Sequence, residues 1–341
     1  MGALMNKILV CGGAGYIGSH VTLSLLRKGH TPVIVDNFTN SDPSVVGRLS
    51  SVAGVKVECH EVELADWGAV SRTFEEVKPS AVIQLAGLKS VGQSVAHPVD
   101  YYSVNLGVTL NILSAMEEYS CSRIVFSSSA TVYGEPEYVP IDEAHCVSPI
   151  NPYGRTKYFQ EEIIRDWVAA GELSSAVILR YFNPVGADAS GVIGEDPSGI
   201  PNNLMPILGD TAAGVRKEVE IFGGDYATRD GTCERDYIHV SDLADAHVAA
   251  LACDPEDKFE VFNVGTGRGV TVREAIDAYS SALGRPLPER MGARREGDAA
   301  SSVAANEKIV SSLNWRPFRS FEDACRDDVR WRANKAQSNS V

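Results

Sequence analysis

The sequence lacks the spacings that mark a metal site or a disulfide framework. It contains seven cysteines, an odd number, and none of them forms a CxxC pair. No HExxH motif and no cluster of cysteines and histidines is present. Cysteines scattered in this way are typical of reduced thiols in a cytosolic protein. We therefore expect no bound metal and a cytoplasmic location.

Long apolar runs and an excess of positive charge are also missing. A membrane-spanning helix needs about 20 consecutive apolar residues, and neither such a run nor a signal-peptide pattern occurs in the 341 residues. The formal net charge of -14 disfavours nucleic acid or an anionic membrane surface as a partner. An anionic ligand of this chain must therefore meet locally placed cations.

The first half of the chain alternates short apolar strands with helical patterns. This alternation predicts an α/β fold, a Rossmann-type doubly wound parallel sheet covered by helices. The expected strands are residues 7–11, 31–35, 81–87, 123–127 and 176–182, and the expected helices include 19–28 and 105–119.

A glycine-rich turn joins the first strand to the first helix. Gly12, Gly15 and Gly18 allow a tight turn, close approach of the backbone to a pyrophosphate, and close packing of helix on strand. The helix N-terminus then faces the phosphates. Asp36 ends the second strand, where it can accept hydrogen bonds from a ribose and repel a 2′-phosphate. This unit predicts NAD rather than NADP as the cofactor.

The second half is richer in glycine and proline, and its stretches 184–203 and 285–305 read as irregular. We expect residues 1–183 to form the NAD-binding Rossmann domain and 184–341 a smaller C-terminal substrate-binding lobe. The segment of about 236–271 contains a strand and a helix that can pack back on the first domain.

Tyr153 and Lys157 are four residues apart, after an Asn151-Pro152 pair that can start a helix. The two side chains should then share one helical face. A nearby ammonium favours the phenolate, which can take a proton from an alcohol. A surface pair without function is the alternative for these two residues taken alone.

A serine run, residues 127–129, closes the predicted strand 123–127 where doubly wound folds place ligands. With the glycine turn and the Tyr153–Lys157 pair, it resembles the extended short-chain dehydrogenases/reductases. The resemblance implies that Ser129 hydrogen-bonds the substrate oxygen and that Tyr153 exchanges the proton. Lys157 would hold the nicotinamide ribose and stabilise the phenolate.

Five further blocks are similar to those of the UDP-glucose 4-epimerases and occur in the same order. They are AGLKSVG (86–92), RYFNP (180–184), PNNLMP (201–206), RDYIHV (235–240) and RREGD (294–298). This resemblance implies reversible oxidation at sugar C4 through a 4-keto intermediate, interconverting UDP-galactose and UDP-glucose. It also implies tightly bound NAD and a homodimer.

The same resemblance implies two sets of binding residues. The cofactor set comprises Gly12, Gly15, Tyr16, Ile17, Gly18, Asp36, Asn37, Glu63, Leu64, Ala86, Gly87, Lys89, Asn105, Ser127, Tyr153, Lys157 and Tyr181. The UDP-sugar set comprises Lys89, Ser129, Tyr153, Asn183, Asn202, Asn203, Leu204, Phe222, Arg235, Arg295, Asp298 and Ser302.

Several positions depart from the family pattern. Gln84, Val104 and Glu63 replace residues at the cofactor edge, which bears on NAD affinity. Ser302 stands where some epimerases carry a bulky tyrosine, and a small side chain there implies that N-acetylated UDP-sugars also fit.

Three other functions remain open. An epimerase for another UDP-sugar is one, because sugar contacts are poorly specified by sequence. A sugar-nucleotide 4,6-dehydratase needs an Asp-Glu pair where this chain has Ala130 and Thr131. A non-catalytic NAD sensor on the same fold has no need of the Tyr153–Lys157 pair.

Overall fold

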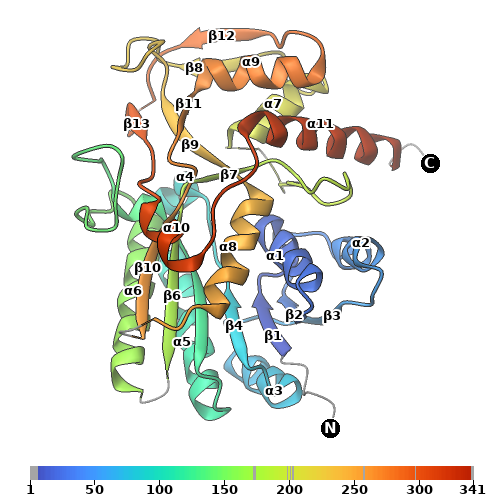
Figure 1. The fold of residues 1–341 in the computed structure, drawn as a ribbon, viewed down its shortest axis with the longest axis vertical. Helices are drawn as coiled ribbons and strands as arrows, with labels where there is room; N and C mark the ends of the chain where they lie inside the picture. Colours follow the sequence, from blue (N-terminus) through green and yellow to red (C-terminus); the bar gives the residue numbers. More distant parts are fainter. Residues whose placement is uncertain are drawn as a thin grey trace.

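The computed structural model describes residues 7–171, 174–197, 199, 201, 203–255, 258–295 and 297–338. Its centre is a seven-stranded sheet in the order β10-β6-β5-β4-β1-β2-β3, in which all neighbouring strands are parallel (Figure 1). The doubly wound parallel sheet predicted from the sequence is confirmed. Its strands are β1 (Lys7–Cys11), β2 (Thr31–Asp36), β3 (Glu58–Glu61), β4 (Ala81–Gln84), β5 (Arg123–Ser129), β6 (Ser175–Tyr181) and β10 (Phe259–Val264).

Helices cover both faces of this sheet because its central strands are apolar on both sides. On one face α3 (Trp67–Val77), α5 (Pro98–Glu118) and α6 (Pro152–Ala170) pack on a core that includes Phe74 and Phe126. On the other face α1 (Tyr16–Arg27), α8 (Val240–Ala252) and α10 (Glu307–Leu313) pack around Leu25 and Phe262. The short helix α2 (Ser44–Ala53) lies against α1, and α4 (Val91–Ala96) lies beside α5 and α6.

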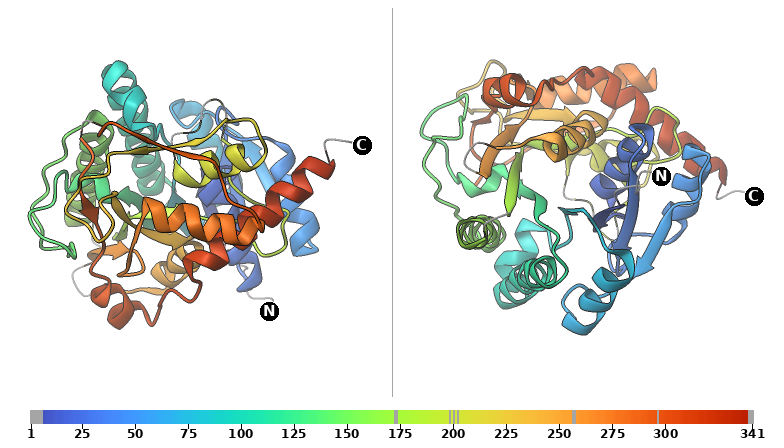
Figure 2. Two further views of the ribbon diagram at one scale, coloured as in Figure 1. Left: turned by 90° about the horizontal axis from the view of Figure 1, so that it is seen from above. Right: turned by 60° about the horizontal axis from the view of Figure 1, so that its bottom comes forward.

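A smaller lobe lies at the carboxyl ends of the β-strands, at the top of Figure 1 and uppermost again in the right-hand view of Figure 2. Its core contains Tyr237, Tyr279 and Phe321. One of its sheets joins β7 (Asn183–Val185), β9 (Glu234–His239), β11 (Gly269–Thr271) and β13 (Ser301–Ser302), and another joins β8 (Val219–Phe222) to β12 (Glu289–Gly292). Its helices are α7 (Leu204–Ala212), α9 (Val272–Leu283) and α11 (Phe321–Ser338).

The chain crosses between the large sheet and the lobe more than once. After β9 it returns to the large sheet, where α8 packs on α1 and β10 pairs with β6. It then re-enters the lobe at β11, which pairs with β9. Residues 236–271 therefore contribute to both parts.

Some element boundaries differ from those predicted. Helix α1 begins at Tyr16 rather than at residue 19, because the last glycine of the turn lies inside its first helical turn. Helix α5 begins at Pro98 rather than at residue 105, with the proline in the first turn, where its missing N–H is tolerated. The strand predicted for 81–87 ends at Gln84, and the backbone then turns through Gly87 with a φ of 153°.

Candidate active site

Helix α6 starts where the sequence predicted. The side chain of Asn151 accepts a hydrogen bond from the backbone N–H of Gly154 at 2.8 Å, and Pro152 lies in the first turn. This cap fixes the first turn of the helix. Tyr153 and Lys157 consequently lie on one face of α6, next to the carboxyl end of β5.

Lys157 is held at the end of β5. Its Nζ donates a 2.6 Å hydrogen bond to the carbonyl oxygen of Ser127 and lies 4.9 Å from the ring centre of Phe126. Burial lowers the pKa of Lys157 to about 8, while the carboxylate of Glu161 acts in the opposite direction. The ammonium is thus fixed by the strand and is only moderately basic.

The phenol of Tyr153 lies beside the hydroxyl of Ser129, whose hydrogen bonding acts to lower the pKa of the phenol. Burial raises the pKa of Tyr153 to about 12, and the Ser129 hydrogen bond offsets part of this rise. Lys157 Nζ lies 6.0 Å from the centre of the Tyr153 ring and bonds to Ser127 instead. Stabilisation of the phenolate by Lys157 therefore stays a prediction for the site with its ligands bound.

Ser129 lies at the turn where β5 ends in a single 3-10 turn over Ala130–Val132. Its Oγ accepts hydrogen bonds from the backbone N–H of Thr131 at 3.2 Å and from the Thr131 hydroxyl at 2.9 Å. Because Thr131 donates two hydrogen bonds to it, the Ser129 oxygen has a fixed position beside Tyr153. The sequence did not single out Thr131 for this role.

The glycine turn is built for close approach of a ligand. Gly12 has a φ of 77°, and a Cβ there would lie 2.9 Å from the backbone nitrogen of Ala86. A Cβ on Gly18 would overlap the carbonyl oxygen of Gly12. Gly15 is the N-cap of α1 and has no side chain that could bond to the first backbone N–H groups of the helix, so these groups are left for a ligand. This backbone fits the pyrophosphate of a dinucleotide.

Asp36 ends β2 next to this turn. Its Oδ2 accepts from the backbone N–H of Ala14 at 3.0 Å, and its Oδ1 accepts from Phe38 N–H at 2.9 Å and Ser41 Oγ at 3.1 Å. The carboxylate thereby ties β2 to the glycine turn and still has acceptor capacity for a ribose hydroxyl.

Asn37 and Glu63 are brought together at the edge of the site. Asn37 Nδ2 donates to Glu63 Oε2 at 2.8 Å, and Glu63 Oε1 accepts from the N–H of Ala65 at 3.0 Å. Leu64 is buried in the core behind them. Tyr16 donates through its hydroxyl to the carbonyl of Gly186 at 2.7 Å, and Ile17 packs against the core beneath α8.

The loop after β4 is braced by two side chains. Asn105 accepts from the N–H of Leu88 at 2.8 Å and donates to the Leu88 carbonyl at 3.1 Å and to Thr156 Oγ1 at 3.0 Å. Gln84, one of the departures, donates to the carbonyl of Ala86 at 3.0 Å. Both therefore shape the turn through Gly87, while Val104 packs on the sheet core.

Five residues of the predicted substrate set meet in the lobe. Arg295 makes hydrogen bonds to both carboxylate oxygens of Asp298, at 3.1 and 2.8 Å, and its guanidinium lies 5.4 Å from the ring centre of Phe222. Arg235 approaches Asp298 to 3.5 Å. Ser302 joins this group because it is paired with Arg235 between β13 and β9.

The other predicted substrate residues lie elsewhere on the site. Asn203 caps α7 and donates to Glu195 Oε1 at 3.1 Å, while Leu204 follows it in the first turn of the helix. Asn183 is exposed at the start of β7, and Lys89 is exposed in the loop before α4. Asn202 lies outside the described residues.

Tyr181 turns toward the sheet core. Its hydroxyl contacts His247 Nε2 of α8, and it also hydrogen-bonds with Ser127. Contact of Tyr181 with a cofactor stays a prediction.

Glu195 was not among the residues predicted from the sequence. It is buried, its Oε1 accepts from Asn203, and its Oε2 has no hydrogen-bond partner. Nothing in the sequence indicated the contact between Glu195 and Asn203.

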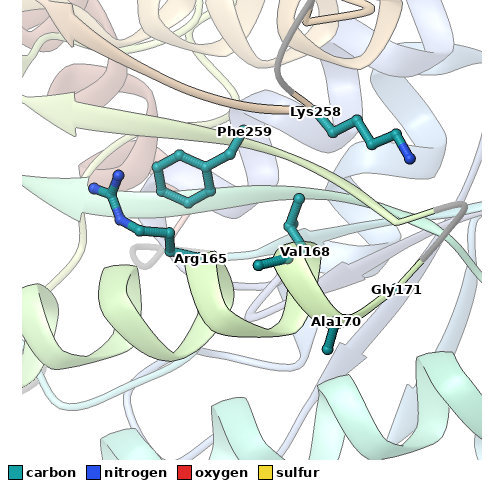
Figure 3. Close-up of a pocket in the computed structure, with 7 residues that line it drawn as sticks. Arg165, Val168, Ala170, Gly171, Lys258 and Phe259 are labelled. Atoms are coloured by element: carbon teal, nitrogen blue, oxygen red, sulfur yellow. The ribbon is translucent and has the colours of Figure 1, made fainter.

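One surface hollow lies apart from this site. Figure 3 shows it between the C-terminal end of α6 and the start of β10, lined by Arg165, Val168, Lys258 and Phe259 among others. It contains no predicted site residue. Within the described ranges no group of three or more possible ligands could hold a metal ion, and no helix has the length and hydropathy of a membrane span.

Comparison with known proteins places these features in a family. The model of the family described as "NAD dependent epimerase/dehydratase family" matches residues 8–265. The chain is 48% identical to UDP-glucose 4-epimerase 2 of Arabidopsis thaliana over 336 residues, which are 97% of this chain and 96% of the relative.

Two solved structures are similar along almost the whole chain. The UDP-glucose 4-epimerase of Stenotrophomonas maltophila, with bound NAD and formylated UDP-arabinopyranose, has a TM-score of 0.94 and 42% identity, covering 99% of this chain and 100% of its own. That of Bifidobacterium longum, in complex with NAD+ and UDP, has a TM-score of 0.93 and 43% identity, covering 97% and 99%.

Proposed function

Since the chain belongs to the NAD-dependent epimerase/dehydratase family, and within it to the UDP-glucose 4-epimerases, we propose that it interconverts UDP-galactose and UDP-glucose. The reaction is a reversible oxidation at sugar C4 that uses NAD without net consumption. The observation that carries the proposal is the placement of Tyr153 beside Ser129 at the end of β5, with the Lys157 ammonium bonded to Ser127 one helical turn further on.

Tyr153 exchanges the proton of the sugar 4-hydroxyl. Ser129, whose position is fixed by two hydrogen bonds from Thr131, hydrogen-bonds the same oxygen and orients it. Bound NAD would supply the chemistry of hydride acceptance and return at sugar C4, and its positive charge would favour the Tyr153 phenolate. Tyr153 then gives the proton back to the oxygen.

The residues that would hold NAD line the carboxyl ends of β1, β2 and β4. The Gly12–Gly18 turn faces the pyrophosphate, and Asp36 accepts from the adenosine ribose. Asn37 and Glu63, which hydrogen-bond each other, border the adenine. Lys157 donates to the nicotinamide ribose. The other residues of the cofactor set are proposed to contact NAD as well: Tyr16, Ile17, Leu64, Ala86, Gly87, Lys89, Asn105, Ser127 and Tyr181.

The UDP moiety is anchored in the lobe. Arg235 and Arg295 offer planar, forked donors suited to a diphosphate, in a protein whose net charge is otherwise negative. Phe222 offers an apolar face to the uracil, and Asp298 accepts from a ribose hydroxyl. Firm binding of UDP leaves the sugar free to turn its other face to the cofactor.

Further polar groups complete the anchor. Asn183 and Asn203 are exposed and can donate to the pyrophosphate or to the uracil, and Leu204 adds an apolar contact. Lys89 supplies a positive charge near both phosphate sites. Asn202 is proposed for the same anchor from the sequence alone.

Incubation of the purified protein with UDP-galactose, without added NAD, tests the function. Anion-exchange chromatography should reveal UDP-glucose, formed with cofactor retained through purification. A 4-keto-6-deoxy product would identify a dehydratase instead. If there is no product even after NAD is added, the proposal is wrong and another UDP-sugar or a sensor role takes its place.

The structure favours epimerisation over dehydration. A 4,6-dehydratase needs an additional acid–base pair next to Ser129, but the 3-10 turn there presents Ala130 and Thr131. The Thr131 hydroxyl is already engaged with Ser129 Oγ at 2.9 Å. Neither side chain can remove the proton that elimination of water requires.

We also propose that N-acetylated UDP-sugars are substrates. Ser302 lies on β13 beside Arg235 and has a small side chain, which leaves room at the sugar 2-position. A Ser302→Tyr variant should lose turnover of UDP-GlcNAc and keep that of UDP-glucose. Absence of UDP-GlcNAc turnover in the wild-type protein would contradict this substrate range.

A homodimer in the cytoplasm is our proposal for the state in the cell. Large apolar side chains are exposed on neighbouring helices, among them Val95 and Val99 of α4 and α5, Leu110 of α5 and Phe159 of α6. Sedimentation equilibrium should give twice the chain mass, and titration of the denatured protein should find seven free thiols. A monomer would contradict the homodimer, and oxidised cysteines would contradict the cytoplasmic location.

A further inference from the structure

Behind the candidate catalytic residues lies a row of buried polar side chains that the mechanism above does not use. Glu161 of α6 and Arg180 of β6 form a two-point ion pair, with Nε–Oε1 and Nη2–Oε2 distances of 3.0 and 2.6 Å. Their exposed fractions are 0% and 4%. Arg180 Nη1 also donates to the phenol oxygen of Tyr133 at 3.0 Å, and Tyr133 donates to Asn263 Oδ1 at 2.7 Å.

A gain in folding stability is by itself a weak explanation for the buried Glu161–Arg180 ion pair. The loss of hydration of two buried charges offsets much of their attraction, and apolar residues of similar size often serve as well. The position of Glu161 points to a second role. Tyr153, Lys157 and Glu161 follow one another at intervals of four residues, so they lie along one face of α6.

Glu161 also reaches the strand that carries Ser129. The hydroxyl of Ser128 donates a short hydrogen bond to Glu161 Oε1, and the carbonyl of Ser127 accepts from Lys157. Two successive residues of β5 are thus fastened to two successive turns of α6. The next residue of the strand is Ser129, so this double attachment fixes its position relative to Tyr153.

The charge of Lys157 depends on few neighbours. Lys157 is only 5% exposed, and the carboxylate of Glu161 is the group whose charge favours its protonated form. Burial alone would drive the pKa of Lys157 below its value of about 8. The titratable and charged groups around it are Tyr153 and Glu161 of α6, Arg180 and Tyr181 of β6, Tyr101 of α5, and His247 of α8 behind Tyr181.

We propose that Glu161 is a positioning residue for the catalytic group: it holds the end of β5 through Ser128 and places a carboxylate one helical turn from the Lys157 ammonium, while Arg180 holds Glu161 itself in place. This inference rests on the proposed roles of Ser129, Tyr153 and Lys157. It extends the catalytic group into the protein core, to a residue that touches neither substrate nor cofactor.

The direct test is titration of Lys157 in the protein as purified, labelled with ¹³C at the lysine ε-carbons. Its NMR signal is identified by its absence in Lys157→Arg. In Glu161→Gln the amide oxygen can still accept from Ser128, but the charge is gone. The pKa of Lys157 should fall from about 8 to ~7 or below, because loss of a nearby opposite charge shifts a pKa by about one or more.

Two variants control for other effects. Glu162→Gln removes the adjacent, partly exposed carboxylate that pairs with Arg165, and should leave the Lys157 titration unchanged. Glu161→Asp keeps the charge and should restore most of the wild-type pKa. If Glu161→Gln does not fold with Arg180 unpaired, the double variant Glu161→Gln/Arg180→Met removes both charges and should show the same fall.

Kinetics give a second readout. At pH 8 Glu161→Gln should lower kcat for UDP-galactose about fivefold, with KM nearly unchanged, because a fall of the Lys157 pKa from about 8 to ~7 lowers its protonated fraction from about one half to about one tenth. An unchanged Lys157 titration in an active variant would overturn the inference and leave the proposed function intact. A fall in the Lys157 pKa in a protein without epimerase activity would contradict the proposed function alone.

Discussion

Burial and hydrogen bonding act in opposite directions on the phenol of Tyr153. Burial raises its pKa to about 12 and the Ser129 hydrogen bond offsets part of that rise. The phenol is therefore neutral until charge enters the site. A positive charge brought into the site by a ligand would then favour the phenolate.

Replacement of Tyr153 by phenylalanine tests its part in proton exchange. The Tyr153→Phe variant keeps the ring and loses the hydroxyl, so kcat should fall by a factor of about 10²–10⁴, the usual contribution of a positioned acid–base group. Tyr158→Phe, on the same helix, should leave kcat unchanged. Assays at matched NAD content decide between these outcomes, and a Tyr153→Phe enzyme of full activity would contradict the mechanism.

At the scale of elements, the turn between β1 and α1 contains two glycines that are needed for different reasons. A Cβ on Gly18 would overlap the Gly12 carbonyl oxygen, whereas a Cβ on Gly15 would meet only that oxygen, at 3.4 Å. Gly18 is therefore required by the packing of α1 on the turn. Gly15 has room within the protein, so we expect its small size to serve the approach of a ligand.

Alanine at these two positions should give different results. Gly18→Ala should lower the free energy of unfolding by about 1–3 kcal/mol, as overpacking does. Gly15→Ala should keep the stability of the ligand-free protein and lose NAD. Urea unfolding of cofactor-stripped protein and the NAD released on acid denaturation measure the two effects. Equal destabilisation of the ligand-free protein by both variants would contradict this account of the turn.

At the scale of the whole molecule, the parallel sheet was predictable because its strands are short apolar runs with helical patterns between them. The glycine turn, Asp36 and the Tyr153–Lys157 pair were predictable because their function requires fixed local spacings. Each of these signals is contained in a short stretch of chain, residues 12–36 for the glycine turn with Asp36 and residues 153–157 for the pair, so a single sequence displays them.

Contacts between distant segments were not predictable. Ser302 pairs with Arg235 through a strand of two residues, which has no detectable pattern of its own. Glu161 and Arg180 are charged residues in the core, and Asp236 is a buried carboxylate that accepts from Thr266 and Gly267 N–H at 2.8 and 2.9 Å. Burial of a charged group depends on partners that only the tertiary fold brings together.

One such group makes stability depend on pH. Burial lowers the pKa of His247 to about 4, below its unfolded value of 6.5. Between these values the unfolded chain binds more protons than the native one, so stability is lost as pH falls. The free energy of unfolding of the wild type relative to His247→Gln should decrease by about 2 kcal/mol from pH 7.5 to pH 5. A difference independent of pH would show that His247 is not buried as a neutral ring.

The central claim is that C4 of the sugar is oxidised and reduced within one site. UDP-galactose carrying deuterium at C4 tests it most directly, with mass spectrometry and NMR of the UDP-glucose formed in ordinary water without added NAD. The account predicts that deuterium is retained at C4, because the hydrogen leaves as hydride and returns from the same cofactor. Replacement of the deuterium by solvent hydrogen would contradict it, since C4 would then have been inverted by loss and return of a proton.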